Sequence, residues 1–389
     1  MKKLIKKVLN NEIFRIIFTM LLILFVLDMI FLKKILLLTI LILLLLITLM
    51  IFYKLYFKVS FININKIKEY LLYLKYKKIS GECIYSQNIK INTFDGSGCL
   101  THPSVLYFEN GFNGYKFWMV HTPYNNCDIS LENPCIVVSN DGINFEELKE
   151  INNPLLPILK EKNPKKYYND PNLVYTDCLE LWYRYTIEHE AGKIENYVYR
   201  MTSKDGIKWS SPKLILKDEL GDKLYMSLSV LYEKDIYKLY FVNNNLLLRE
   251  IESTDLKKWT KEKDINIISE SIWHGEIKLD NDGLYKLLFI DKNYNLCICE
   301  SIDGINFSNL KKINLYCKCK DYFYFKSLVY KSSIVFVDDD IYLYTPFRYD
   351  KVKLFAINDV ISHTWHLSVT KLRKENLEEI CTLLDEEEL

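Results

Sequence analysis

The sequence lacks a net charge of either sign and lacks the short motifs of several large enzyme classes. Its 389 residues include 51 basic and 50 acidic side chains, so the net charge is +1 and no overall field attracts nucleic acid. It contains no glycine-rich phosphate loop, no Gly-x-Ser-x-Gly elbow and no His-Glu-x-x-His pair. Its ten cysteines do not have zinc-site spacing. We therefore predict no nucleic-acid partner, no metal and no cofactor.

What the sequence does contain is a repeated motif, Ser-x-Asp-Gly-x-x-aromatic. Three copies lie at Ser139 to Phe145, Ser203 to Trp209 and Ser301 to Phe307, and a fourth at Ser253 to Trp259 has Leu256 in place of glycine. The aspartate can accept hydrogen bonds from amides downstream, and the glycine can adopt the positive φ of a tight turn. The regular spacing predicts one supersecondary unit that is repeated along the chain.

Strand-like segments lie around each motif, and the composition favours β-structure because aromatic residues make up 14% of the chain. Four-stranded units of this length are typical of propeller blades. We therefore predict an all-β, five-bladed propeller over residues 81–370, closed by a strand within Cys83 to Ile91. A β-sandwich or a six-bladed ring is the alternative. The predicted strand pairs are 104–108 with 115–121, 173–175 with 179–185, 230–232 with 237–242, 277–279 with 285–290, and 328–330 with 334–336, the last followed by 341–345.

Two long apolar runs precede this region. The first, at about 13–32, contains Arg15 and Asp28, and the second, at about 35–53, contains no charge. Each has about the 20 residues that a bilayer-spanning helix needs. We therefore predict a two-helix transmembrane hairpin within residues 1–57, with the lipid bilayer as a partner. An interfacial helix is the alternative for the first run.

The charges and thiols predict where the chain lies in the cell. Lysines precede the first apolar run and follow the second, which favours cytoplasmic termini. The cysteines, all from Cys83 onward, favour a reducing compartment. We predict an integral membrane protein with a cytoplasmic domain, and the extracytoplasmic face is the alternative. Residues 58–80 then form a basic juxtamembrane linker, and residues 371–389 form an acidic C-terminal tail.

The innermost strand of each propeller blade begins near the axis, so the residues at its start line one mouth of the ring. Glu276 lies two residues after His274, so both side chains point to the same side of a strand. Asp170 and Glu276 come from different blades and could meet across one central site. The positions that align in the five inner strands are His102, Asp170, Ser227, His274 and Phe325.

Two carboxylates on either side of a sugar are what glycoside hydrolysis requires. Glu276, beside Trp273, is the better acid because burial raises a carboxyl pKa, and Asp170 is the better base. The alternative is that Asp170 caps a turn with Pro171 and that Glu276 is a structural hydrogen-bond acceptor.

Further polar and aromatic residues are predicted at the same mouth as substrate-binding groups. Aromatic rings can stack on the C–H faces of sugars, although strand aromatics also serve as core. The predicted substrate-binding residues are His102, Glu132, Asn133, Trp118, Tyr124, Tyr168, Arg184, Trp273 and His274.

Three features carry a resemblance to a known group: the segment Asn169-Asp170-Pro171-Asn172, the repeated turn motif, and the segment His274-Gly275-Glu276. On these features the region of roughly residues 81–370 resembles the five-bladed propeller glycosidases, a superfamily that includes families 43, 32, 62, 68 and 130. The resemblance implies an axial aspartate in the first blade, a second aspartate that tunes pKa, and a glutamic acid in a later blade. Glu276 matches the acid, and Asp170 matches one aspartate.

One position departs from that pattern, because the first blade opens with Thr101-His102-Pro103 where the family would have aspartate. The leading hypothesis is a membrane-anchored, glycosidase-like propeller that acts on a glycan or glycoconjugate through Asp170 and Glu276. The alternative is a catalytically degenerate propeller that binds a glycan or a protein partner without turnover. A membrane-anchored scaffold without glycan affinity is a third possibility.

Overall fold

The chain divides into two compact units, residues 1–67 with 353–358 and residues 68–352 with 359–389. No helix among the described residues is long and apolar enough to cross a membrane. The described part of the first unit is helical at 19–25 and 44–49, so most of the predicted hairpin and all of the predicted linker lie outside the described residues. The computed structural model describes residues 19–25, 42, 44–49, 87–159, 163–190, 192–267, 271–315, 317–319, 322–324, 326–349 and 365–383.

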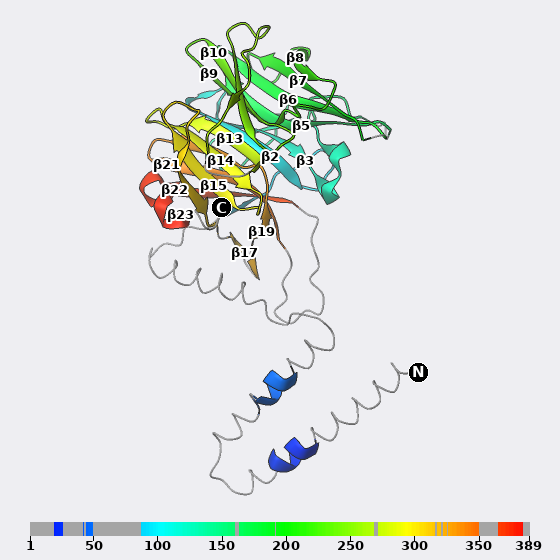
Figure 1. The fold of residues 1–389 in the computed structure, drawn as a ribbon, viewed down its shortest axis with the longest axis vertical. Helices are drawn as coiled ribbons and strands as arrows, with labels where there is room; N and C mark the ends of the chain where they lie inside the picture. Colours follow the sequence, from blue (N-terminus) through cyan, green and yellow to red (C-terminus); the bar gives the residue numbers. More distant parts are fainter. Residues whose placement is uncertain are drawn as a thin grey trace. The chain divides into compact units, whose positions relative to one another are not determined.

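The second unit is an all-β propeller of five antiparallel blades, as predicted (Figure 1). Blade 1 holds β2 (Leu100–Phe112), β3 (Tyr115–Pro123) and β4 (Cys135–Ser139). Blade 2 holds β5 (Lys165–Tyr175), β6 (Leu179–Glu188), β7 (Ile194–Ser203) and β8 (Lys213–Asp218). Blade 3 holds β9 (Met226–Glu233), β10 (Ile236–Val242), β11 (Leu248–Ser253) and β12 (Lys263–Asp264).

Blades 4 and 5 complete the ring and include both ends of the propeller segment. Blade 4 holds β13 (Ile272–Leu279), β14 (Tyr285–Asp291), β15 (Leu296–Ser301), β16 (Ser308–Ile313) and β23 (Cys381–Leu383). Blade 5 holds β19 (Lys326–Val329), β20 (Ser333–Val337), β21 (Asp340–Tyr349), β22 (His366–Arg373) and β1 (Gln87–Ile89). A separate hairpin pairs β17 (Cys317–Cys319) with β18 (Tyr322–Tyr324), and short 3-10 turns lie at Asn125–Cys127, Ile129–Leu131 and Lys374–Ile380.

Blade 5 closes the ring, with one confirmed prediction and one correction. The early strand β1 pairs with β22, so the segment predicted to complete the last blade does so. The predicted hairpin of 328–330 with 334–336 is wrong, because β19 and β20 both pair with β21 and together form one interrupted inner strand. Regular structure also continues past residue 370, since β23 pairs with β16 of blade 4.

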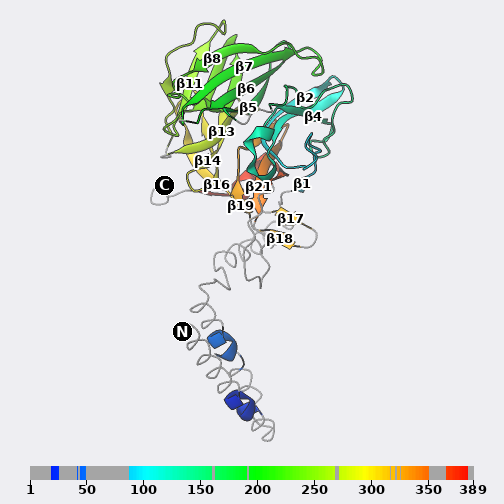
Figure 2. The same ribbon diagram turned by 90° about the vertical axis from the view of Figure 1, so that its right-hand side faces the viewer.

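The core consists of five apolar clusters, each drawn from two neighbouring blades. Figure 2 shows the strands of blade 2 beside those of blade 1. Trp118 of blade 1, for example, packs with Leu173 of blade 2, and Ile334 of blade 5 packs with Leu288 of blade 4. Burial of both faces of every blade therefore depends on closing the ring, as expected for a repeat that cannot bury its apolar surface alone.

The repeated turn motif fixes one blade against the next. In blade 2, Ser203 Oγ accepts from Gly206 N at 2.8 Å, and Asp205 Oδ1 accepts from two downstream amides, each at 2.8 Å, as predicted. Gly206 has φ of +74°, and a Cβ added there would lie 2.2 Å from the Trp118 ring of blade 1. The glycine therefore provides both the turn and the space for a neighbouring blade. Leu256, which replaces glycine in the fourth copy, also has a positive φ of 59°.

We expect Gly206→Ala to lower the free energy of unfolding by about 2–4 kcal/mol, because the methyl group adds overpacking to backbone strain. Gly283→Ala is the matched control: Gly283 has φ of +79°, and its Cβ would meet nothing within 4 Å. This control should lose about 1 kcal/mol, from strain alone. Urea unfolding of both variants measures the difference. Equal losses would contradict the packing role of Gly206.

His121 makes the stability of the propeller depend on pH. It is fully buried on β3, and neither ring nitrogen has a hydrogen-bond partner among the described residues. Burial lowers its pKa to about 3, so stability that is present above the unfolded value near 6.5 is lost as the pH falls toward 3. We expect His121→Leu to remove about 2 kcal/mol of the stability loss between about pH 7.5 and about pH 5, measured by urea unfolding. An unchanged pH slope would contradict this assignment.

Candidate active site

One residue from the inner strand of each blade lies at the hub of the propeller. Four of these residues lie at or beside register shifts, such as those between Thr101 and Ser104 on β2 and between Asn169 and Asn172 on β5. The fifth lies in the break between β19 and β20. A bulge of this kind turns a side chain out of the regular alternation of a strand. All five side chains are at most 2% exposed. The five hub residues are His102, Asp170, Ser227, His274 and Lys331.

The sequence alignment of inner strands found four of these five residues. Phe325, predicted for the fifth, lies outside the described residues, and Lys331 takes the hub position of blade 5. A signal for Lys331 was available, because Ser333 follows it by two residues just as Ser104 follows His102. The inner strand of blade 5 is interrupted between β19 and β20, so the alignment of Lys331 with the other hub residues was not recognised.

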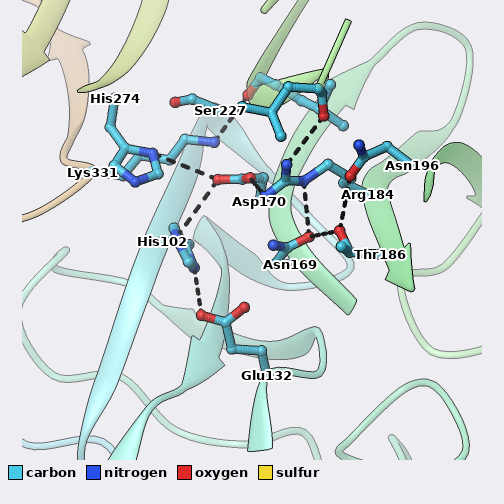
Figure 3. Close-up of polar contacts among 12 residues, drawn as sticks. His102, Glu132, Asn169, Asp170, Arg184, Thr186, Asn196, Ser227, His274 and Lys331 are labelled. Atoms are coloured by element: carbon cyan, nitrogen blue, oxygen red, sulfur yellow. Dashed lines mark hydrogen bonds and ion pairs between the residues drawn. The ribbon is translucent and has the colours of Figure 1, made fainter. Parts of the chain in front are cut away.

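Two histidines face one carboxylate oxygen at the hub (Figure 3). His102 Nε2 and His274 Nδ1 each lie 3.6 Å from Asp170 Oδ1. Each of the three residues, from blades 1, 2 and 4, offers one possible ligand atom, and these atoms all lie within 4.8 Å of one another. The three residues are called the hub triad below.

Neighbouring side chains hold the hub triad in place. Arg184 Nη2 lies 3.0 Å from Asp170 Oδ2, and its other nitrogens donate to Asn169 Oδ1 and to the carbonyl of Leu224, each at 3.1 Å. The guanidinium thus fixes one oxygen of Asp170 and leaves Oδ1 toward the histidines (Figure 3). Arg184 was predicted at the same mouth as a substrate-binding residue, and that role stays a prediction.

A second contact orients the ring of His102. Its Nδ1 lies 2.9 Å from Thr122 Oγ1 and 3.9 Å from Glu132 Oε1, so Nε2 is directed at Asp170. Hydrogen bonding of one imidazole nitrogen is the usual way in which proteins set the tautomer of a metal-binding histidine. Glu132 was predicted at this mouth and lies here, whereas Thr122 was not predicted.

Burial and charge set the protonation of the hub triad. Burial alone would raise the pKa of the Asp170 carboxyl, but Arg184 and the two histidines outweigh it and hold that pKa below its ordinary value. Burial lowers the pKa of His102 to about 4 and the pKa of His274 well below 6.5. At neutral pH the site therefore has one carboxylate and two neutral imidazoles, the forms that ligate metals.

The hub triad fits a divalent metal ion. Both nitrogens of His274 and Asp170 Oδ1 are buried without a hydrogen-bond partner among the described residues, a state that is costly unless another group satisfies them. Imidazole nitrogen with carboxylate oxygen suits zinc, iron or similar divalent ions, and three protein ligands leave a position for water or substrate. Sequence spacing did not reveal this set, because its members come from three blades.

Glu276 occupies a different ring of positions, two residues after the hub residues. In every blade, the side chain at this position accepts a hydrogen bond from the inner strand of the next blade; we call these five bonds the inter-blade belt. They run from Leu173 N to Ser104 Oγ (3.2 Å), Val230 N to Asn172 Oδ1 (2.9 Å), Ile277 N to Ser229 Oγ (2.8 Å), Ile334 N to Glu276 Oε2 (3.1 Å) and Val105 N to Ser333 Oγ (3.1 Å).

The belt favours the structural interpretation of Glu276. This carboxylate is fully buried, and four of the five belt positions hold serine or asparagine, which cannot protonate a leaving group. Its second oxygen, Oε1, lies 3.6 Å from Lys278 Nζ. The pairing of Asp170 with Glu276 as catalytic carboxylates stays a prediction.

Lys331 brings a positive charge to the hub that sequence reasoning missed. Its side chain is fully buried, and Nζ donates to the carbonyl of Leu228 at 2.9 Å. Burial lowers the pKa of Lys331, and the charges of Asp170 and Glu276 act in the opposite direction.

The predicted aromatic residues divide between the hub and the core. Tyr124 stacks on Tyr330, with ring centroids 6.2 Å apart, and the Tyr330 ring lies 4.5 Å from that of His274. Trp273 lies beside His274, at 6.1 Å. Two others are placed in the core between blades 1 and 2: Trp118, which is fully buried, and Tyr168.

Asn133 also has a structural partner, because its side chain donates to the backbone carbonyl of Leu156 at 2.9 Å. Tyr330, which no sequence pattern singled out, contacts both histidines of the hub triad, with its ring 5.1 Å from that of His102. It directly precedes Lys331, so the same missed register explains both omissions.

Comparisons with known proteins relate part of the chain to a sugar deacetylase. No family model matches the chain. An A type blood N-acetyl-α-D-galactosamine deacetylase of Flavonifractor plautii is 34% identical over 118 residues. The match covers 29% of this chain and only 15% of the relative's length.

Solved structures show the likeness of fold. An N-acetylgalactosamine deacetylase from F. plautii, solved in complex with blood group B trisaccharide, aligns with a TM-score of 0.60 at 16% identity and covers 78% of this chain and 99% of that one. The RS223 β-xylosidase aligns with a TM-score of 0.48 at 11% identity and covers 74% and 95%. The chain has a five-bladed β-propeller fold, and it shares its fold with the N-acetylgalactosamine deacetylase structure.

Proposed function

We propose that the chain is a metal-dependent hydrolase that removes the acetyl group from an N-acetylated amino sugar of a glycan. The observation that carries this proposal is the hub triad, in which ligand atoms of His102, Asp170 and His274 converge. Among the described residues, Asp170 Oδ1 and both nitrogens of His274 are buried there without a hydrogen-bond partner. The deacetylase activity named for the F. plautii relative, which shares 34% identity over a short segment, supports the choice of reaction.

The residues of the site have distinct roles in this reaction. The hub triad would hold the ion, which when bound supplies Lewis-acid chemistry to a carbonyl or a water molecule. Arg184 keeps Asp170 ionised, and Thr122 fixes the ring of His102. Hydrolysis adds one water across the amide bond, breaks its C–N bond, and yields acetate and a free amino sugar.

Glu132 is suited to move the proton that this reaction requires. It is 4% exposed, and burial, followed by the charge of Asp170, raises its pKa well above the ordinary value. A carboxyl group in such a setting can hold a proton near neutral pH and give it to the leaving amine. Its oxygen Oε1 lies 3.9 Å from His102 Nδ1, beside the hub triad.

Glycoside hydrolysis by Asp170 and Glu276 is the second candidate. The resemblance to propeller glycosidases favours it, whereas the inter-blade belt assigns Glu276 a structural contact. Binding without turnover is the third outcome, which the histidine in the first blade favours.

One experiment separates these functions. Full-length protein is treated with EDTA and then supplied with Zn²⁺, Mn²⁺, Fe²⁺ or Ni²⁺. Acetate release from N-acetylated mono- and oligosaccharides and sugar release from aryl glycosides are then measured. We expect acetate release that EDTA abolishes and one of these ions restores. Sugar release that EDTA does not affect would overturn the proposal in favour of the carboxylate pair. Saturable glycan binding without any product would support the degenerate alternative.

A further inference from the structure

Trp273 is unusual among the tryptophans of this chain. It is 37% exposed, whereas Trp118, Trp182 and Trp365 are at most 4% exposed, and Trp209 and Trp259 are half-buried. Its neighbours Ile272 and His274 are at most 2% exposed, so β13 sends these two inward and Trp273 outward. Exposing an indole to water forgoes the favourable free energy of burying its apolar surface. Core packing therefore does not account for the presence of tryptophan at this position.

The backbone of β13 produces this orientation. The β13–β14 ladder shifts register between Ile272 and His274, so Trp273 is the extra residue of a β-bulge. Bulges beside active sites commonly re-aim a side chain. The same bulge that turns His274 toward Asp170 therefore turns Trp273 outward.

A second exposed aromatic ring is built beside it. Tyr294 is 45% exposed, and its ring centroid lies 6.5 Å from that of Trp273. Tyr294 has φ of 60°, a conformation that a non-glycine residue adopts only where the surroundings enforce it.

The surroundings that enforce this conformation centre on Asp291. Its Oδ1 accepts from the amides of Asn293 and Asn295, each at 2.8 Å, and Oδ2 accepts from the Asn295 side chain at 2.7 Å. The Tyr294 amide donates to the Asp291 carbonyl at 3.1 Å. Because Asp291 pairs with Ile272 across the ladder, one short turn fixes Tyr294 next to Trp273.

We propose that Trp273 and Tyr294 form an outer sugar-binding subsite, which binds the sugar next to the one that reacts at the hub triad. The inference rests on the proposed function, because it takes the hub triad as the place of reaction. The Trp273 ring lies next to that place, 6.1 Å from the ring of His274. Two preset aromatic rings match the C–H faces of a pyranose and lose little conformational entropy on binding. The preferred ligand is therefore an oligosaccharide rather than a single sugar.

The subsite predicts different kinetics for short and long substrates. We expect Trp273→Ala and Tyr294→Ala each to raise KM for an oligosaccharide about tenfold, with kcat unchanged, because the subsite contributes equally to substrate and transition state. Neither variant should change KM for the monosaccharide. Tyr175→Ala is the matched control, because Tyr175 is a 44% exposed tyrosine at the C-terminal end of β5.

Calorimetry with wild type and the three variants tests binding apart from turnover. The probes are N-acetylgalactosamine, N-acetylglucosamine, a blood group A trisaccharide and chitotriose. We expect wild type to bind at least one trisaccharide about tenfold more tightly than its monosaccharide, and both site variants to lose that gain. Equal affinities for short and long probes in wild type, or a gain that survives both substitutions, would overturn the subsite. A gain that depends on Trp273 in a protein that releases no acetate would overturn the proposed function and leave the subsite standing.

Discussion

Asp170→Asn is expected to lower acetate release by more than about 100-fold and to remove most of the bound metal. The neutral amide keeps the size of the side chain but is a much weaker ligand than the carboxylate at the centre of the hub triad. It also leaves the buried Arg184 without its negative partner, although Arg184 still donates to Asn169 and to Leu224. The measurements are acetate release, metal content per chain and urea unfolding.

Asp280→Asn is the control for the loss of a buried carboxylate. Asp280 is 6% exposed and accepts from the amides of Asp282 and Leu284 in the β13–β14 turn, with no contact to the hub triad among the described residues. This variant should lose stability and keep its metal and its activity. Full metal content and activity in Asp170→Asn would contradict the assignment of Asp170 as a ligand.

The sequence was informative wherever a feature repeats. The turn motif carries its own hydrogen bonds within a few residues, so its geometry at Asp205 and Gly206 could be predicted from local chemistry. Because equivalent strands of a ring present equivalent residues at the hub, the alignment of inner strands also predicts that His102, Asp170 and His274 lie together.

What could not be predicted depends on contacts between blades. The position of Trp118 beneath Gly206 and that of Glu276 in the inter-blade belt both depend on the next blade, and a single strand pattern does not specify what that blade presents. The sequence pattern of an inward-pointing carboxylate is the same whether the carboxylate accepts a hydrogen bond from a backbone amide or contacts a substrate. The candidate metal site was not predicted for a related reason. Ligand-spacing rules apply to residues close in sequence, whereas His102, Asp170 and His274 are brought together only by closure of the ring.

The role of Glu276 can be decided by measuring its coupling to Lys331. Both side chains are fully buried, and the charge of Glu276 raises the pKa of Lys331 against the effect of burial. Lys331→Met leaves two buried carboxylates, Asp170 and Glu276, without that positive charge. We expect it to lower the free energy of unfolding by about 3–5 kcal/mol, the usual cost of removing one partner of a buried ionic group.

Glu276→Gln keeps the belt, because the amide oxygen can still accept from Ile334 N, and we expect it to cost about 1 kcal/mol. The double variant should lose less free energy of unfolding than the sum of the two single losses, by more than about 1 kcal/mol. The reason is that the buried lysine and the buried carboxylate compensate each other in the wild type. Lys278→Met, paired with Glu276→Gln, gives a second cycle in which coupling is also expected, because Lys278 Nζ lies 3.6 Å from Glu276 Oε1. If Glu276 is structural, Glu276→Gln should retain acetate release near the wild-type rate. A folded, metal-loaded Glu276→Gln that has lost all turnover would instead assign this residue to the chemistry and restore the carboxylate pair.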